Sequence, residues 1–182
     1  MEKMKKYELT TNTIVHNGRT LYQIKALMNF GIIREGDLGG YIESEKNLSQ
    51  EGNAWVGCNA RVSGNARVSG NASVSGNAGV SGNAWVSGNA WVSGNASVRG
   101  NAWVSRNEDY TTIKGFGTEY RNATFFRCED GNVRVTCGCF YGTIDEFRER
   151  VKTTRTGKIA EEYLMIADLM EFHFREENTN DM

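Results

Sequence analysis

The sequence predicts a mainly β protein in which a solenoid of short strands lies between an N-terminal hairpin and a small C-terminal α+β domain. Residues 52 to 105 form nine consecutive six-residue units of the type G-N-A-x-V-S, without insertion. An Asn-Gly pair interrupts alternating apolar residues near the N-terminus, and two helix-like segments follow residue 143. The chain has 21 glycines and no proline, which suits a regular array of turns. We divide it into 1–35 (hairpin and cap), 36–106 (repeat) and 107–182 (C-terminal cap domain).

The overall composition excludes several classes of protein. The net charge of −1 provides no global field that would attract nucleic acid or an anionic membrane. Four cysteines in 182 residues are too few for a disulfide scaffold, and no run of about 20 apolar residues could cross a bilayer. The start, MEKMKKYELTTN, lacks the apolar core of a signal peptide. We therefore expect a cytoplasmic protein with reduced thiols and no membrane contact.

The N-terminal segment predicts a hairpin that leads into the repeat. In TIVHNGRTLYQI, Asn17-Gly18 suits a type I′ turn between two strands. Residues 19 to 35 continue as a strand or short helix that could cover the first coil. The next segment joins the array in frame, which places Ile42 and Leu48 where later units have alanine and indicates one further, irregular coil. His16, at the hairpin tip, is interpreted as a solvated turn residue.

The six-residue period is incompatible with a helix. At 100° per residue, each unit would rotate the Ala and Val positions by a further 120° around a helix, so no constant apolar face would form. In an extended chain, A-x-V instead directs Ala and Val to one side, and S-G-N supplies a corner. The units therefore predict a solenoid filled by Ala and Val, with the asparagine of every unit stacked in ladders at the corners.

The unit V-S-G-N-A-x resembles the hexapeptide of left-handed parallel β-helix proteins. The resemblance implies left-handed winding and three units in each triangular coil, so that nine units make three coils. It also implies a homo-oligomer, commonly a trimer, although a dimer through one face or through the cap is an alternative.

The outward-facing x positions carry the candidate binding residues. Taking every eighteenth residue groups them by face, and two of the three faces then hold all four tryptophans. Because exposed tryptophans are costly and often mark interaction sites, we expect a binding surface, with cover by the terminal segments as the alternative. Arginines beside tryptophans could grip carboxylates, whereas direct binding of nucleic acid or nucleotides is weakly supported. The candidates are Trp55, Arg61, Arg67, Trp85, Trp91 and Trp103.

Residues 107 to 182 predict a small acidic α+β domain, with 10 basic and 15 acidic residues. Residues 123 to 141 suggest two strands around a turn at Asp130-Gly131. Thr143 and Glu146 have the spacing of a capping box that begins a helix. A second amphipathic helix spans about 159 to 174. One of its faces carries Ile159, Tyr163, Ile166, Ala167 and Met170.

The motifs CGCFYGTIDEF and DLGGYIESEKNLS, at either end of the repeat, are similar to those of hexapeptide-repeat proteins from bacteriophages and prophages. The resemblance covers nearly the whole chain but provides no set of catalytic residues. It implies a non-enzymatic phage-type interaction protein whose partner is a bacterial host factor. Inhibition or sequestration of a nuclease-based, CRISPR-like defence component, in the cytoplasm of the host, is the favoured expectation.

An enzymatic function is the alternative. The best-known enzymes with this repeat are CoA-dependent acyltransferases that use a histidine base, but the nine units contain no histidine. Only His16 and His173 remain, and they would have to act across a subunit boundary. Two histidines also exclude a three-histidine zinc site within one chain.

The cysteines and acidic residues do not predict a metal site. Cys128, Cys137 and Cys139 lack the paired C-x2-C spacing of zinc sites, so we interpret them as structural thiols, with a metal or redox pairing as alternatives. Cys58 replaces a glycine of the repeat. Asp37, Glu43 and Glu45 are interpreted as solvated charges. We therefore expect no catalytic residues, no cofactor and no metal.

Overall fold

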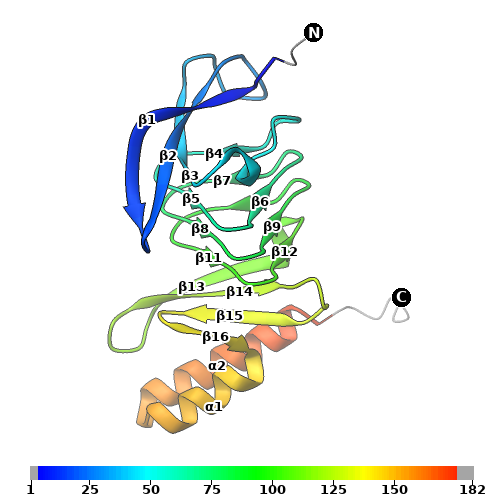
Figure 1. Ribbon diagram of the computed structural model, residues 1–182. Helices are drawn as coiled ribbons and strands as arrows, with labels where there is room; N and C mark the ends of the chain where they lie inside the picture. The colour runs from blue at the N-terminus through cyan, green and yellow to red at the C-terminus, as the bar shows by residue number, and fades with distance from the viewer. Residues whose placement is uncertain (1–3, 176–182) are drawn as a thin grey trace, which may run out of the picture.

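The computed structural model describes residues 4–175 and contains three stacked parts (Figure 1). A hairpin lies along the N-terminal end of a β-solenoid, and an antiparallel sheet with two helices lies at the other end. The solenoid has about four turns, because one of its faces stacks β3, β5, β8 and β11 in parallel. The predicted β-solenoid with flanking hairpin and α+β part is thus confirmed.

The predicted hairpin consists of β1 (Tyr7–His16) and β2 (Arg19–Ala26), paired antiparallel. Asn17 and Gly18 have φ angles of 50° and 74°, as a type I′ turn requires. Strand β2 then pairs antiparallel with β3 (Leu38–Ile42), which is the first strand of the solenoid. The hairpin therefore extends one face of the solenoid into a six-stranded sheet.

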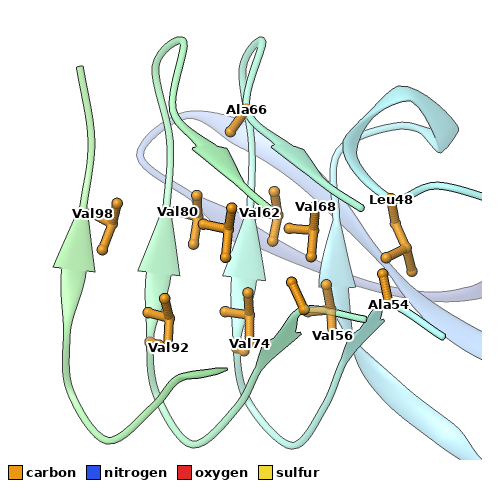
Figure 2. Packing of buried hydrophobic residues seen from close by; sticks show 14 of the residues in the cluster. Leu48, Ala54, Val56, Val62, Ala66, Val68, Val74, Val80, Val92 and Val98 are labelled. Atoms are coloured by element: carbon orange, nitrogen blue, oxygen red, sulfur yellow. The ribbon is translucent and has the colours of Figure 1, made fainter. Parts of the chain in front are cut away.

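The nine repeat units form the remaining strands, in three parallel sheets whose members are 18 residues apart. Every alanine and valine of the repeat points inward and is at most 2% exposed. Figure 2 shows these side chains meeting across the narrow interior. The strands are β4 (Trp55–Val56), β5 (Arg61–Val62), β6 (Arg67–Val68), β7 (Ser73–Val74), β8 (Gly79–Val80), β9 (Trp85–Val86), β10 (Trp91–Val92), β11 (Ser97–Val98) and β12 (Trp103–Val104).

The frame that we predicted for the first coil is wrong. Ile42 pairs with Val62, and Leu48 pairs with Val68, so both residues occupy the valine position and not the alanine position. The cause is an enlarged corner, because Leu48 and Val56 are eight residues apart where later valines are six apart. The larger side chains fill an end of the interior that has no further coil above it.

The corners of the solenoid carry the predicted asparagine ladders. Amide groups of successive coils donate to one another at 3.1 to 3.3 Å. The residue before each asparagine has a left-handed backbone, which is why glycine recurs there, and Cys58 adopts φ 54° at the one unit that lacks it. The ladders run Asn53–Asn71–Asn89, Asn65–Asn83–Asn101 and Asn77–Asn95.

The polarity of the coil-to-coil hydrogen bonds determines which side chains close the N-terminal end. The N–H groups of each coil donate to carbonyls of the next coil, so the first coil has carbonyls without a donor above them. The buried ammonium of Lys6 donates to Ala54 O at 2.9 Å and to Gly52 O at 3.3 Å. The Asn47 side chain donates to Ala66 O at 2.9 Å. This end of the solenoid is therefore closed by donors.

The C-terminal end has the opposite requirement, because the last coil presents N–H groups with no carbonyl below them. Side-chain oxygens accept these hydrogen bonds at 2.8 to 3.2 Å. The acceptors are Asn107 for Trp91, Tyr110 for Ser93, Thr124 for Ser97, and Asp109 for Ser105 and Arg106. Satisfying an exposed strand edge in this way also blocks the addition of another chain.

Burial lowers the pKa of Lys6 from 10.5 to about 8. Between these values the unfolded chain binds a proton that the folded chain has lost, so the free energy of unfolding contributed by Lys6 rises with pH, by roughly 3 kcal/mol in all. We predict that Lys6→Met removes this rise, as measured by urea unfolding at pH 7.5 and pH 10. The control is Lys5→Met, because Lys5 is exposed and pairs with Glu45 at the surface. A parallel pH dependence in wild type and Lys6→Met would contradict the prediction.

The C-terminal sheet contains β13 (Tyr110–Phe116), β14 (Arg121–Arg127), β15 (Val133–Cys137) and β16 (Phe140–Thr143), antiparallel in that order. The predicted turn at Asp130-Gly131 joins β14 and β15, whereas β13 and β16 were not predicted as separate strands. Strand β14 alternates between two cores, because Phe126 packs with the solenoid valines and Phe125 packs with the helices.

Two helices cover the outer face of this sheet (Figure 1). Helix α1 (Ile144–Thr154) begins with the predicted capping box, in which Thr143 Oγ1 accepts from Glu146 N at 3.1 Å and Glu146 accepts from Thr143 N at 2.7 Å. Helix α2 (Gly157–His173) buries the predicted face. Neither helix, nor any other helix within residues 4–175, has the length and apolar character needed to cross a bilayer.

Candidate binding face

Three candidate residues line up on the outer side of the sheet β6–β9–β12, which we call the tryptophan face. Trp103 pairs with Trp85, and Trp85 pairs with Arg67, each one coil apart. The two indole rings are in contact, with centroids 4.7 Å apart and planes inclined by 55°. Trp85 Nε1 donates to Ser69 Oγ at 3.0 Å, which holds this ring against the preceding coil. Trp85 and Trp103 are nevertheless 39% and 38% exposed, so they form an ordered apolar patch in contact with solvent.

Cationic groups lie at both ends of the tryptophan face. Arg67 is exposed, and no carboxylate within the described part of the chain lies at ion-pair distance from it. Beyond Trp103 lies an open pocket of about 470 Å³, which Arg106 and Arg127 help to line. Because neighbouring coils are about 4.8 Å apart, Arg67 and Trp103 are separated by roughly 10 Å along the face. Asp109 and Glu129 line the same pocket, so the face presents two indoles between the guanidinium of Arg67, unpaired within the described residues, and a pocket that holds both arginines and carboxylates.

Asp109 fixes the arginine end of the face. Its buried carboxylate accepts hydrogen bonds from Ser105 N, Ser105 Oγ and Arg106 N, all at 2.9 Å, and lies 3.7 Å from Arg127 Nε. Burial by itself would raise the pKa of Asp109, but these hydrogen bonds and the charge of Arg106 outweigh it and lower the pKa. The ionised carboxylate therefore holds the corner that follows Trp103 in place.

Trp91 lies on a neighbouring face of the solenoid, in the sheet β4–β7–β10. It is 58% exposed, and its Nε1 donates to Ser75 Oγ at 3.0 Å. The ring borders a shallow groove whose other wall includes Tyr110 and Thr112. Its partner in the ladder is Ser73, so this indole has no aromatic neighbour on its own face. Trp91 is accessible but isolated.

Trp55 does not belong to an exposed surface, contrary to our expectation for a binding residue. It is only 7% exposed, because the N-terminal segment covers it. The ring of Phe30 packs edge-on against it at 5.5 Å. Gly39 passes so close that a Cβ atom there would lie 2.7 Å from the indole. For this tryptophan the alternative, cover by a terminal segment, is correct.

Arg61 is also occupied within the molecule. It is half-buried, and its guanidinium donates to Asn77 O at 3.3 Å. The hairpin lies nearby, where burial and the charge of Arg61 lower the pKa of His16. Of the six candidates, the structure therefore brings together Arg67, Trp85 and Trp103, leaves Trp91 apart, and engages Trp55 and Arg61 elsewhere.

The other candidate groups are dispersed. His16 is the last residue of β1, at the hairpin tip, and His173 is the last residue of α2, in a different part of the fold. Cys128 is buried beside the last coil, where burial raises its pKa to about 11. Cys137 and Cys139 line a separate cavity of about 220 Å³ under α1. Within residues 4–175 no three histidine, cysteine or acidic side chains are grouped closely enough to bind a metal.

Sequence comparison adds no assignment to this geometry. No protein-family model matches the chain, and no curated protein shows significant similarity to it.

Proposed function

We propose that the protein is a non-enzymatic interaction protein that binds a partner protein through the tryptophan face. The observation that carries this proposal is the exposed pair Trp85–Trp103, whose rings are in contact one coil apart beside Arg67, which is unpaired within residues 4–175. Tryptophan and arginine dominate the energetic centres of protein interfaces, since each offers a large contact surface together with hydrogen-bond donors. The coil-to-coil hydrogen bonds hold these side chains on a rigid sheet, which reduces the entropy lost on binding.

The chemistry of the face defines the partner surface that it fits. The two indoles need an apolar patch, and Arg67 favours a carboxylate or carbonyl oxygen beside that patch, whereas Arg106 at the other end already pairs with Glu108. The arginine end adds Arg127, whose Nη2 donates to Phe174 O and whose position is therefore fixed. A protein surface can supply apolar and acidic groups at this spacing, whereas a nucleic-acid backbone would meet too few cations.

The sequence resemblance supports a narrower form of the proposal. A phage-type protein would act in the cytoplasm of a bacterial host and would inhibit or sequester a host factor, such as a nuclease-based, CRISPR-like defence component. In this proposal the acidic C-terminal part serves as the cap of the solenoid, and the tryptophan face remains free for the partner.

To test the proposal, the protein is immobilised and partners are captured on it from a bacterial lysate. We predict that Trp85→Ala combined with Trp103→Ala weakens binding of a captured partner by about 100-fold or more, because each indole at the centre of an interface contributes at least about 1 to 2 kcal/mol. Trp91→Ala is the matched control, because it removes the same side chain from the neighbouring face and should leave the affinity unchanged. Circular dichroism verifies that all variants are folded. A partner that binds the double variant as tightly as the wild type would refute the assignment of the face.

A further inference from the structure

Helix α2 has two apolar faces, of which only one is covered. Its inner face packs against the sheet through Tyr163, Ile166 and Met170. On the opposite side, Met165, Leu169 and Phe172 are 71%, 56% and 69% exposed. Their spacing of four and three residues places them in one stripe along the helix. Three large apolar side chains so exposed form a patch comparable to the largest on a typical monomer, which usually has an interaction role.

We infer that this stripe is the interface of a homodimer in which the α2 helices of two copies pack antiparallel. A two-fold axis near Leu169 would bring the two Leu169 side chains together and would place Met165 opposite Phe172 of the second copy. Both are favourable pairs, since leucine packs well on itself and the thioether of methionine contacts aromatic rings favourably. The stripe is therefore complementary to itself.

The charges beside the stripe select the antiparallel arrangement. Glu161 lies one turn before Met165, and Arg175 lies just after Phe172, with its guanidinium 5.7 Å from the Phe172 ring. Antiparallel packing brings Glu161 of each copy beside Arg175 of the other. Parallel packing would instead place like charges side by side, which is unfavourable. Within the described residues, Glu161 forms no ion pair in its own chain.

Two further carboxylates near the axis are partly compensated by an arginine of the neighbouring helix. Asp168 flanks the stripe, and Glu171 lies further round the helix. Both accept hydrogen bonds from Arg148 of helix α1, which is largely buried by these contacts. Arg148 also pairs with Asp145, so one guanidinium serves three carboxylates and this cluster stays acidic, which opposes the approach of two copies and limits the affinity of the dimer. The dimer would leave both tryptophan faces free, because they lie on the solenoid and not on α2.

Sedimentation velocity of the full chain tests this inference. The patch is at the small end of stable interfaces, so we expect a dimer with Kd on the order of 10 μM. Leu169→Glu should weaken dimerisation at least about 30-fold, while the thermal unfolding temperature stays close to that of the wild type. The control is Ile32→Glu, since Ile32 is an exposed apolar residue far from α2. A wild type that is monomeric up to about 200 μM, or equal weakening by the two variants, would overturn the inference.

Cysteine cross-linking tests the antiparallel packing. The background variant has the exposed Cys58 replaced by glycine and the exposed Cys139 replaced by serine. In this background, Leu169→Cys should form a disulfide between position 169 of one copy and position 169 of the other. Met165→Cys should cross-link to Phe172→Cys when the two variants are mixed, but not to itself. Self-linkage of Met165→Cys would refute antiparallel packing. The double variant Trp85→Ala with Trp103→Ala should leave the dimer intact. Failure of the dimer hypothesis is therefore distinguishable from failure of the hypothesis that the tryptophan face binds a partner.

Discussion

Replacing Val80 with aspartate is expected to prevent folding of the solenoid. Val80 is 1% exposed and pairs with Val62 above it and Val98 below it. The interior offers no cation or hydrogen-bond donor to a carboxylate at this point, and burying an unpaired charge costs several kcal/mol out of a total stability of about 5 to 15 kcal/mol. Far-UV circular dichroism and size-exclusion chromatography should show an unfolded or aggregated chain.

The adjacent residue provides the matched control. Gly79 faces outward, and a Cβ atom at this position would meet no other atom within 4 Å. Gly79→Asp therefore introduces the same carboxylate one residue away, beside Arg61 in the ladder, and should fold normally. If both variants folded, or if both failed to fold, the alternation of inward valines and outward x residues would be contradicted.

Replacing Asp109 with alanine is expected to destabilise the fold by about 2 to 4 kcal/mol. The change leaves the N–H groups of Ser105 and Arg106 without an acceptor and leaves Arg127 without its carboxylate. In a chain of this length the loss corresponds to a fall in Tm of roughly 10 °C, measurable by calorimetry. Glu108→Ala is the control. Glu108 pairs with Arg106 at the exposed surface, so the control should change stability by less than about 0.5 kcal/mol.

The loss of stability caused by Asp109→Ala should depend on pH with a definite sign. Because the folded-state pKa of Asp109 is lowered, its contribution to stability is complete above the pKa of the unfolded chain and disappears as the pH falls through the folded pKa. The difference in unfolding free energy between wild type and Asp109→Ala should therefore be largest near neutral pH and should shrink in acid. A difference that stays constant down to the lowest pH would contradict the ionised role of Asp109.

Features that depend on the period could be predicted from the sequence. A period of six, together with the three units per coil that the family resemblance implies, places residues 18 apart in contact and predicts the pair Trp85–Trp103 and the asparagine ladders. The capping box at Thr143 was predictable because it is local, with both of its partners within one helical turn. Local and periodic signals were therefore sufficient for most of the fold.

Features that depend on contacts between distant segments could not be predicted. Trp55 occupies the same position of the repeat unit as the other tryptophans, so its sequence context does not distinguish it. Its burial arises from Phe30 and Gly39, which lie outside the repeat and carry no periodic signal. Arg127 joins the tryptophan face only because β14 returns beneath the last coil, and β13 has no alternation strong enough to reveal it. The exposed stripe on α2 is recognisable only once the other face of the helix is known to be the buried one.

The assignment of the tryptophan face as the partner-binding surface is tested most directly by site-specific photo-cross-linking. A benzophenone amino acid in place of Arg67 would project from the tryptophan face, and the same amino acid in place of Ser73 would project from the neighbouring face. We predict that a partner captured by the wild type is cross-linked from position 67 and not from position 73. Cross-linking of the same partner from position 73 alone, or equally from both positions, would contradict the assignment.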